Sequence, residues 1–253
     1  LAQLENPTPP GDELPTPGLE VQLPLINPTN NTITGTALGQ PIALSSEVRT
    51  LPGMFGHALQ VGDRPAVEIG DYGNFDGKQG FSYGGFIYIE GKPGGAILAR
   101  MDAGDNYQGW DFYIQNGQIG AHVIERWPDV AVKAYTKKPL TPKKWHHVMV
   151  VYDPSNQKAS LTVYLDGKPA PLDYSHNKLG KDIQSLVPMS LGSRAGNDAR
   201  LTGVLAAQDL QVISRPLKQN EVQDLAHKSM VRGLQYAPKS KPLLAALRNH
   251  FDV

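Results

Sequence analysis

Short apolar segments separated by turn residues fill this chain from Leu19 to Ile213. Glycine and proline supply many of the separations, with 26 glycines and 21 prolines among 253 residues. No stretch of helical spacing stands between one apolar segment and the next, so the pattern predicts roughly ten short β-strands. The predicted strands are Val21–Ile26, Ala66–Ile69, Phe81–Glu90, Ala96–Met101, Trp110–Gln115, Gln118–Ile124, Trp145–Tyr152, Ser160–Leu165, Met189–Leu191 and Gly203–Ile213.

The turn chemistry between these segments predicts antiparallel pairing. Asn116-Gly117 is typical of a two-residue hairpin, because both residue types tolerate the positive φ that a type I′ turn requires. Leu161, Val163 and Leu165 alternate with polar residues, which places all three on one face of a strand. Neighbouring strands without helices between them form antiparallel sheets. We therefore expect an all-β fold in which two antiparallel sheets pack as a β-sandwich or jelly roll.

The two ends of the chain differ in composition from this central part. Five prolines between Pro7 and Pro17 predict that residues 1–17 form an extended linker. Helical spacing appears only at Lys218–Lys228 and again between Ser240 and Arg248, which predicts short C-terminal helices. We expect one domain over residues 18–229 and a helical tail or linker over residues 230–253.

Charge and cysteine content exclude several classes of function. Lys and Arg together number 24, as do Asp and Glu, so the chain lacks the positive field of a nucleic-acid-binding protein. No run of about 18 apolar residues is present, and we expect no membrane insertion. The absence of cysteine excludes thiol catalysis, disulfides and thiolate metal sites in this chain.

The order of the segments resembles laminin-G-like domains of the concanavalin A-like jelly-roll type over residues 19–228. The segments that carry this resemblance are Phe81–Ile89, Trp145–Asp153, Leu161–Lys168, Met189–Arg194, Leu201–Leu205 and Ser214–Leu217. A narrower set is similar to laminin-G-like domains of planctomycete proteins that also carry cytochrome c-like haem domains. That set is Leu98–Asp102, Tyr107–Asp111, Gln115–Gly117 and Arg126–Asp129. The resemblance implies a larger, exported parent protein.

The sequence lacks the catalytic patterns that this superfamily and other hydrolases use. Retaining glucanases with this fold place two carboxylates on one face through Glu-x-Asp-x-x-Glu, and the pattern is absent. Gly80–Gly84 fits the Gly-x-Ser-x-Gly motif around Ser82, but a strand follows it where a nucleophile elbow needs a helix. We therefore expect a protein without catalytic residues.

Aromatic and polar residues gather in two predicted loop regions. Aromatic faces beside hydrogen-bonding groups are typical of sites that bind carbohydrate or peptide. The candidate ligand-binding residues are Tyr107, Trp110, Arg126, Trp127 and Asp129. Trp110 and Trp127 have an alternative role as side chains that cover the sandwich core.

Calcium is the cofactor that the resemblance implies, because laminin-G-like domains hold it at the rim of the sandwich with oxygen ligands. The matching loop offers Asp102, Asp105 and Asn106. The alternative is a turn of Asp, Gly and Asn that binds no ion.

Three functions stay open from the sequence. The first is a non-catalytic recognition module that binds a polysaccharide or a protein partner. The second is a polysaccharide hydrolase or lyase that uses Arg126, His122 and Tyr113 on one sheet. The third is a structural spacer that packs against neighbouring domains of the same polypeptide.

Overall fold

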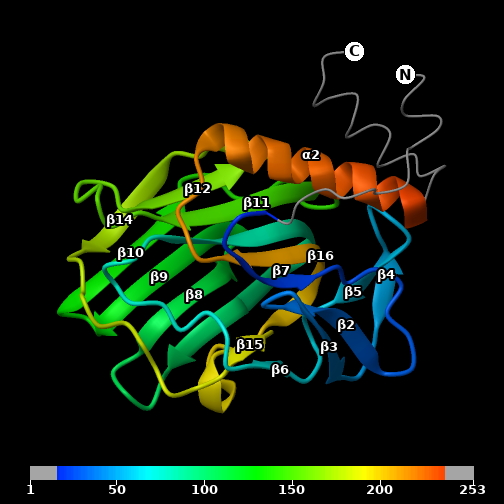
Figure 1. Ribbon diagram of the computed structural model, residues 1–253, viewed down its shortest axis with the longest axis horizontal. Coiled ribbons are helices and arrows are strands. Elements are labelled where there is room, and N and C mark those ends of the chain that lie inside the picture. The colour runs from blue at the N-terminus through cyan, green and yellow to red at the C-terminus, as the bar shows by residue number, and fades with distance from the viewer. Residues whose placement is uncertain (1–15, 237–253) are drawn as a thin grey trace.

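A computed structural model describes residues 16–236 as a β-sandwich with one long helix against it (Figure 1). The strands are β1 (Leu19–Leu23), β2 (Thr32–Ala37), β3 (Gln40–Ser45), β4 (Thr50–Pro52), β5 (His57–Gln60), β6 (Val67–Gly70), β7 (Phe81–Asp102), β8 (Gln108–Gln115), β9 (Gln118–Arg126), β10 (Val130–Thr136), β11 (Trp145–Tyr152), β12 (Leu161–Leu165), β13 (Lys168–Pro169), β14 (Leu172–Asn177), β15 (Met189–Leu191) and β16 (Thr202–Ile213). A 3-10 turn, η1 (Ala195–Asn197), precedes β16, and the helix α2 (Gln219–Tyr236) follows it.

The long strand β7 belongs to both layers of the sandwich. Its first half pairs with β11 and β16, and these strands with β12, β1, β2, β3 and β5 form the first layer. Its second half pairs with β8 and β15, which continue the second layer in the order β14-β10-β9-β8-β7-β15-β6. Every strand pairing within the described residues is antiparallel, so the predicted fold class is confirmed.

Alternating side chains of the two layers meet in an aromatic core. Phe81 stacks on Phe75 with ring centroids 4.4 Å apart, and Tyr83 lies 4.5 Å from Trp110. Trp110 is only 1% exposed, and its indole nitrogen donates a 2.7 Å hydrogen bond to the carbonyl of Gly73. The core therefore fixes the inner face of the second layer and leaves its outer face free to form a site.

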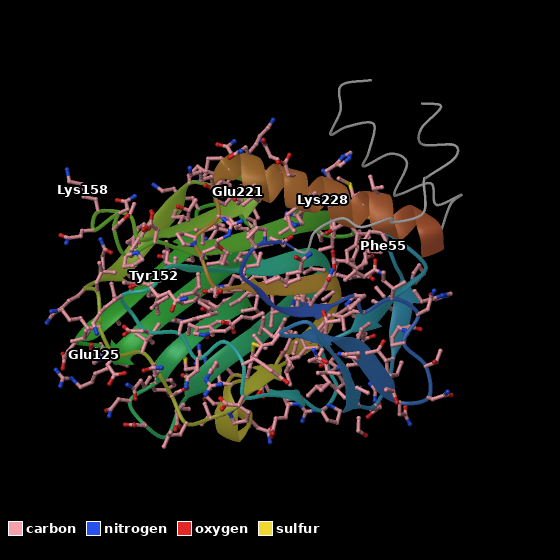
Figure 2. All side chains as sticks on the ribbon, in the orientation of Figure 1. Phe55, Glu125, Tyr152, Lys158, Glu221 and Lys228 are labelled. Atoms are coloured by element: carbon pink, nitrogen blue, oxygen red, sulfur yellow. The ribbon has the colours of Figure 1, made fainter. Side chains whose placement is uncertain are left out.

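The helix α2 packs against the outer face of the first layer, along the top of the view in Figure 1. Val222 and Leu225 contact an apolar cluster that includes Met149 on β11 and Ile213 on β16. Figure 2 shows Glu221 and Lys228 along the same helix. Within the described residues, the helix packs on the first layer and not on the second.

The two C-terminal helices predicted from the sequence have different outcomes. The helix expected at Lys218–Lys228 is present, but it runs on to Tyr236 and crosses the boundary expected between residues 229 and 230. The second helix, expected between Ser240 and Arg248, and most of the predicted 1–17 linker lie outside the described residues. The domain limits therefore stay a prediction.

Candidate binding pocket on the second layer

A pocket of about 510 Å³ lies on the outer face of the second layer. Its floor comes from β8, β9 and β10, and residues on either side of η1 close one edge. The lining side chains that carry aromatic rings, an imidazole or a positive charge are Tyr107, Tyr113, His122, Trp127, Lys133 and Arg194. We call this cavity the outer-face pocket.

Strand register places four polar side chains in one row across this face. Asp111 on β8 pairs with His122 on β9, His122 pairs with Lys133 on β10, and Lys133 pairs with His176 on β14. Directly paired residues point to the same side of a sheet, and adjacent strands lie about 4.8 Å apart. The antiparallel register therefore brings together residues that stand far apart in the chain.

Asp111 is the buried centre of this arrangement, with none of its surface exposed. One carboxylate oxygen accepts from the backbone N–H of His122 at 3.1 Å and from its ring Nδ1 at 2.7 Å. The other oxygen accepts from two nitrogens of Arg194, at 2.8 and 2.7 Å. Burial by itself would raise the pKa of Asp111, but His122 and Arg194 outweigh it and lower the pKa to about 2.

Because Asp111 is ionised at neutral pH, it can only accept hydrogen bonds, and this fixes the orientation of His122. The Nδ1 atom of His122 must therefore be the donor to Asp111. The Nε2 atom has no hydrogen-bond partner among the described residues, and it is not fully buried. The His122 side chain lines the outer-face pocket. The pair presents a fixed imidazole edge to the cavity.

Arg194 closes one edge of the pocket from the segment before η1. Its guanidinium also contacts Asp198 at 3.0 Å, so two carboxylates balance its charge. Burial would lower the pKa of Arg194, but Asp111 and Asp198 raise it overall. The guanidinium carbon stands 5.7 Å from the centre of the Tyr107 ring. Arg194 thus ties the loop after β15 to the floor of the pocket.

Two aromatic groups form the floor and one wall. The Tyr113 ring stacks on His122 with centroids 4.8 Å apart and planes inclined by 25°. It also lies directly over Gly120, where an added Cβ would collide with the ring. Burial and the nearby Asp111 charge raise the pKa of Tyr113, which keeps its hydroxyl neutral. The Tyr113 ring is therefore held flat on the sheet.

Trp127 lines the pocket from the turn between β9 and β10. Its ring lies 4.4 Å from His176 and 5.9 Å from His122. Lys133 stands between the two aromatic groups, with its Nζ 5.6 Å from the Trp127 ring centre and 5.9 Å from that of Tyr113. These positions are typical of cation–π contacts.

The structure brings together only part of the predicted ligand-binding set. Tyr107 and Trp127 line the outer-face pocket. Arg126 and Asp129 are exposed, 3.7 Å from one another, and neither lines the cavity. The prediction for Trp110 is wrong, because this side chain points inward and fills the core. The alternation along β8 puts Trp110 on the face opposite Asp111 and Tyr113.

The side chains of the loop predicted to bind calcium make hydrogen bonds within the loop. Asp102 accepts a 2.9 Å hydrogen bond from the Gly104 N–H, and Asp105 accepts one at 3.1 Å from the Asn106 amide. Within residues 16–236, no group of three or more His, Asp or Glu side chains could hold a metal ion. The calcium site at Asp102, Asp105 and Asn106 stays a prediction.

The structure brings together only part of the catalytic set Arg126, His122 and Tyr113. His122 and Tyr113 lie side by side, but Arg126 stands outside the pocket that they line. The hydroxyl of Ser82 donates to the Arg215 carbonyl and accepts from the Leu217 N–H, both at 2.9 Å. Ser82 therefore has a structural role at the end of the sandwich.

The sequence reasoning missed Asp111, Lys133, His176 and Arg194 as members of the site. Asp111 and Tyr113 are alternate residues on β8, so the period of a strand could have placed both on one face. Lys133 and His176 stand on strands that were not predicted, and Arg194 comes from a loop. No local signal links these residues to Asp111.

The sequence profile of the concanavalin A-like lectin/glucanases superfamily, in its laminin-G form, matches residues 61–223. The chain belongs to this superfamily. The matched range includes β7 to β16 and hence every residue of the outer-face pocket. No relative was found among curated proteins.

Solved structures with the same fold include binding domains of clostridial toxins. The binding domain of Paraclostridial Mosquitocidal Protein 1 matches with a TM-score of 0.63 and 15% identity, over 84% of this chain and 52% of that chain. Botulinum neurotoxin type C, described as depending on two ganglioside molecules to enter cells, matches at 0.58 and 15% over 84% and 51%. The binding domain of botulinum neurotoxin DC in complex with rat synaptotagmin II matches at 0.57 and 14% over 84% and 52%.

This superfamily member thus spans about half the length of the solved chains that it matches. Identity at this level shows a shared fold and leaves the ligand open. Within the described residues, no helix is both long enough and apolar enough to cross a membrane.

Proposed function

We propose that this domain is a non-catalytic recognition module of a larger exported protein and that it binds a glycan in the outer-face pocket. The observation that carries the proposal is the pair of aromatic faces, Tyr113 and Trp127, beside Lys133 and His122 in one cavity. Aromatic faces cover the apolar side of a sugar ring, and the polar groups fix its orientation.

The rigidity of the site supports recognition. Asp111 holds His122 and Arg194 through four short contacts, and the Tyr113 ring lies flat over Gly120. A site of this kind does not need to reorder its side chains when a ligand arrives, which lowers the entropic cost of binding. The floor of the site stands on β8, β9 and β10, while Trp127 and Arg194 come from the loops beside it.

The structural neighbours support binding as the class of function. They are binding domains, and the partners named for them are gangliosides in one case and synaptotagmin II in another. A glycan or protein partner is therefore consistent with the fold. Between these, we favour a glycan because the cavity is small and its walls carry aromatic rings.

A polysaccharide-cleaving activity is the second candidate, and one observation favours it. Asp111 orients His122 through Nδ1, which leaves the other ring nitrogen as a candidate general acid or base in the cavity that Tyr113 also lines. Assays for reducing ends and for unsaturated uronates over a panel of polysaccharides test this candidate. Turnover above the rate without protein, lost in His122→Ala, would replace the first proposal.

Glycan-array binding and calorimetry with the Trp127→Ala variant test the recognition proposal. We expect at least a tenfold loss of affinity for the bound oligosaccharide, since stacking on one aromatic ring contributes about 1.4 kcal/mol or more. Arg126→Ala is the matched control, because Arg126 is the preceding residue and is exposed outside the cavity. Circular dichroism checks that both variants fold.

Unchanged affinity in Trp127→Ala would move the ligand away from the outer-face pocket. Binding to no glycan at all would contradict the proposal and favour the structural spacer. Hydrogen exchange in the parent protein would then show protection of one sandwich face.

A further inference from the structure

The lining of the outer-face pocket contains positively charged side chains but no negatively charged ones. Among the residues that line the cavity there is no aspartate and no glutamate. The nearest carboxylate, Asp111, is fully buried, and both of its oxygens already accept hydrogen bonds. A ligand that enters the cavity therefore meets no accessible negative charge from the lining.

The two lining cations differ in how far their charge is already balanced. Arg194 forms ion pairs with Asp111 at 2.7 Å and Asp198 at 3.0 Å. Lys133 has no carboxylate within ion-pair distance among the described residues, and its contacts are the two aromatic rings. Cation–π contacts orient an ammonium group without neutralising it. The charge of Lys133 is available to a ligand.

The position of Lys133 decides which part of a ligand would use this charge. Its Nζ stands less than 6 Å from the centres of both the Tyr113 and Trp127 rings, at 5.9 and 5.6 Å. A sugar ring that stacks on Trp127 therefore brings its substituents next to the ammonium group. A carboxylate or sulfate on that ring would form a charge-assisted hydrogen bond, which is stronger than the bond to a neutral hydroxyl.

We propose that the outer-face pocket selects acidic oligosaccharides, whose sugar rings carry carboxylate or sulfate groups, and that Lys133 is the residue that determines this selectivity. This inference rests on the proposed function. It adds a ligand class and a selectivity residue that the fold alone does not specify, because an unpaired lysine between two aromatic rings is a property of this chain.

Calorimetry with matched ligands and matched variants tests the inference. The ligands are oligogalacturonate, its fully methyl-esterified form, unsulfated and sulfated chondroitin oligosaccharides, and neutral oligomers of glucose and xylose. Lys133→Met removes the charge and keeps most of the stem, whereas Lys133→Arg keeps the charge. Lys137→Met is the control, because Lys137 is exposed just beyond β10, pairs with Asp173 at 3.3 Å and does not line the cavity.

We expect an acidic ligand to bind the wild-type protein at least tenfold more tightly than its uncharged counterpart. Lys133→Met should remove this preference, while Lys133→Arg and Lys137→Met retain it within about threefold. Higher salt should weaken the binding of acidic ligands. Comparison of the galacturonate and chondroitin series assigns the preferred group as a carboxylate or a sulfate, and a preference for either one supports the inference.

Two results would overturn the inference while leaving the recognition proposal intact. One is equal affinity for oligogalacturonate and its methyl ester together with equal affinity for sulfated and unsulfated chondroitin. The other is tight binding of a neutral oligomer that depends on Trp127 and ignores Lys133→Met. Binding of none of these oligosaccharides would contradict both proposals.

Discussion

Asp111 shows how one buried carboxylate organises the surface above it. It accepts hydrogen bonds from His122 on β9 and from Arg194 beyond β15, and so joins a strand and a loop that the chain order separates. A charge without solvent contact is tolerated only when it is paired and hydrogen-bonded. Both conditions are met here, and the cost of burial is offset by the two partners.

Asp111→Asn should lower the free energy of unfolding at neutral pH by about 3 kcal/mol, because it leaves Arg194 with less compensating charge. The folded pKa of about 2 lies below the unfolded value, so the ionised carboxylate stabilises the fold above about pH 4. That contribution, on the order of 2 kcal/mol, is lost as the pH falls through 2. Denaturant unfolding at several pH values measures it.

The difference between wild type and Asp111→Asn should therefore shrink between about pH 4 and pH 2. Asp198→Asn is the control, since Asp198 pairs with the same guanidinium but its side chain is 36% exposed. Its effect should stay below about 1 kcal/mol. Parallel stability curves for wild type and Asp111→Asn would contradict this account of the carboxylate.

Gly120 is the residue that lets Tyr113 lie flat in the pocket. Gly120→Ala should push the ring off the sheet, reduce ligand affinity about tenfold and lower the free energy of unfolding by about 1 kcal/mol or more. Gly94→Ala is the stability control, because the nearest atom to its new methyl group would be the Ile114 carbonyl oxygen at 4.0 Å. Equal stability losses in the two variants would argue against the special fit at Gly120.

At the scale of elements, local turn chemistry predicted the hairpins well. Asn116 and Gly117 both adopt positive φ, 53° and 75°, and join β8 to β9 as a two-residue turn. The strands β11 and β15 have the predicted bounds. These elements can be predicted from local sequence, since a turn residue and an alternating segment determine them without contacts to distant parts of the chain.

Other elements depend on contacts that no local pattern contains. The strands β10 and β14 escaped prediction, and they lie next to one another at the edge of the second layer. In β14, exposed and half-buried residues alternate, and no residue is fully buried, so its apolar signal is weak. Predicted strands at Phe81–Glu90 and Ala96–Met101 form one strand, β7, because ladder pairing continues through the glycines between them. The pocket residues on these features, such as Lys133 on β10 and Gly95 on β7, could not be assigned to the site from the sequence.

The helix α2 stabilises the first layer through a few apolar side chains. Leu225 is 3% exposed and belongs to the cluster with Met149 and Ile213. Leu225→Ala should lower the free energy of unfolding by about 2–3 kcal/mol without changing glycan affinity, because the pocket lies on the other layer. Chemical denaturation with calorimetry checks both. A loss of affinity at unchanged stability would contradict the separation of helix and pocket.

At the scale of the whole molecule, the fold gives its two outer faces different roles. The helix α2 packs on the first layer (Figures 1 and 2). The second layer carries the outer-face pocket. Figure 2 marks Glu125 at the end of β9, where its carboxylate accepts from the backbone N–H groups of Lys181 and Asp182 at 2.7 and 3.2 Å. These contacts hold the long segment before β15 against the sheet. Shared strand β7 then links the pocket layer to the helix-covered layer.

We propose, above all, that this superfamily member binds its ligand on the outer face of the second layer. Backbone amide NMR during titration with oligogalacturonate, or with the tightest acidic oligosaccharide of the series above, tests it most directly. We expect shift changes concentrated on β8, β9 and β10 and around Arg194, and their loss in Lys133→Met. Changes concentrated instead in residues 24–34 or in residues 102–106, with β8 to β10 unaffected, would contradict binding in the outer-face pocket.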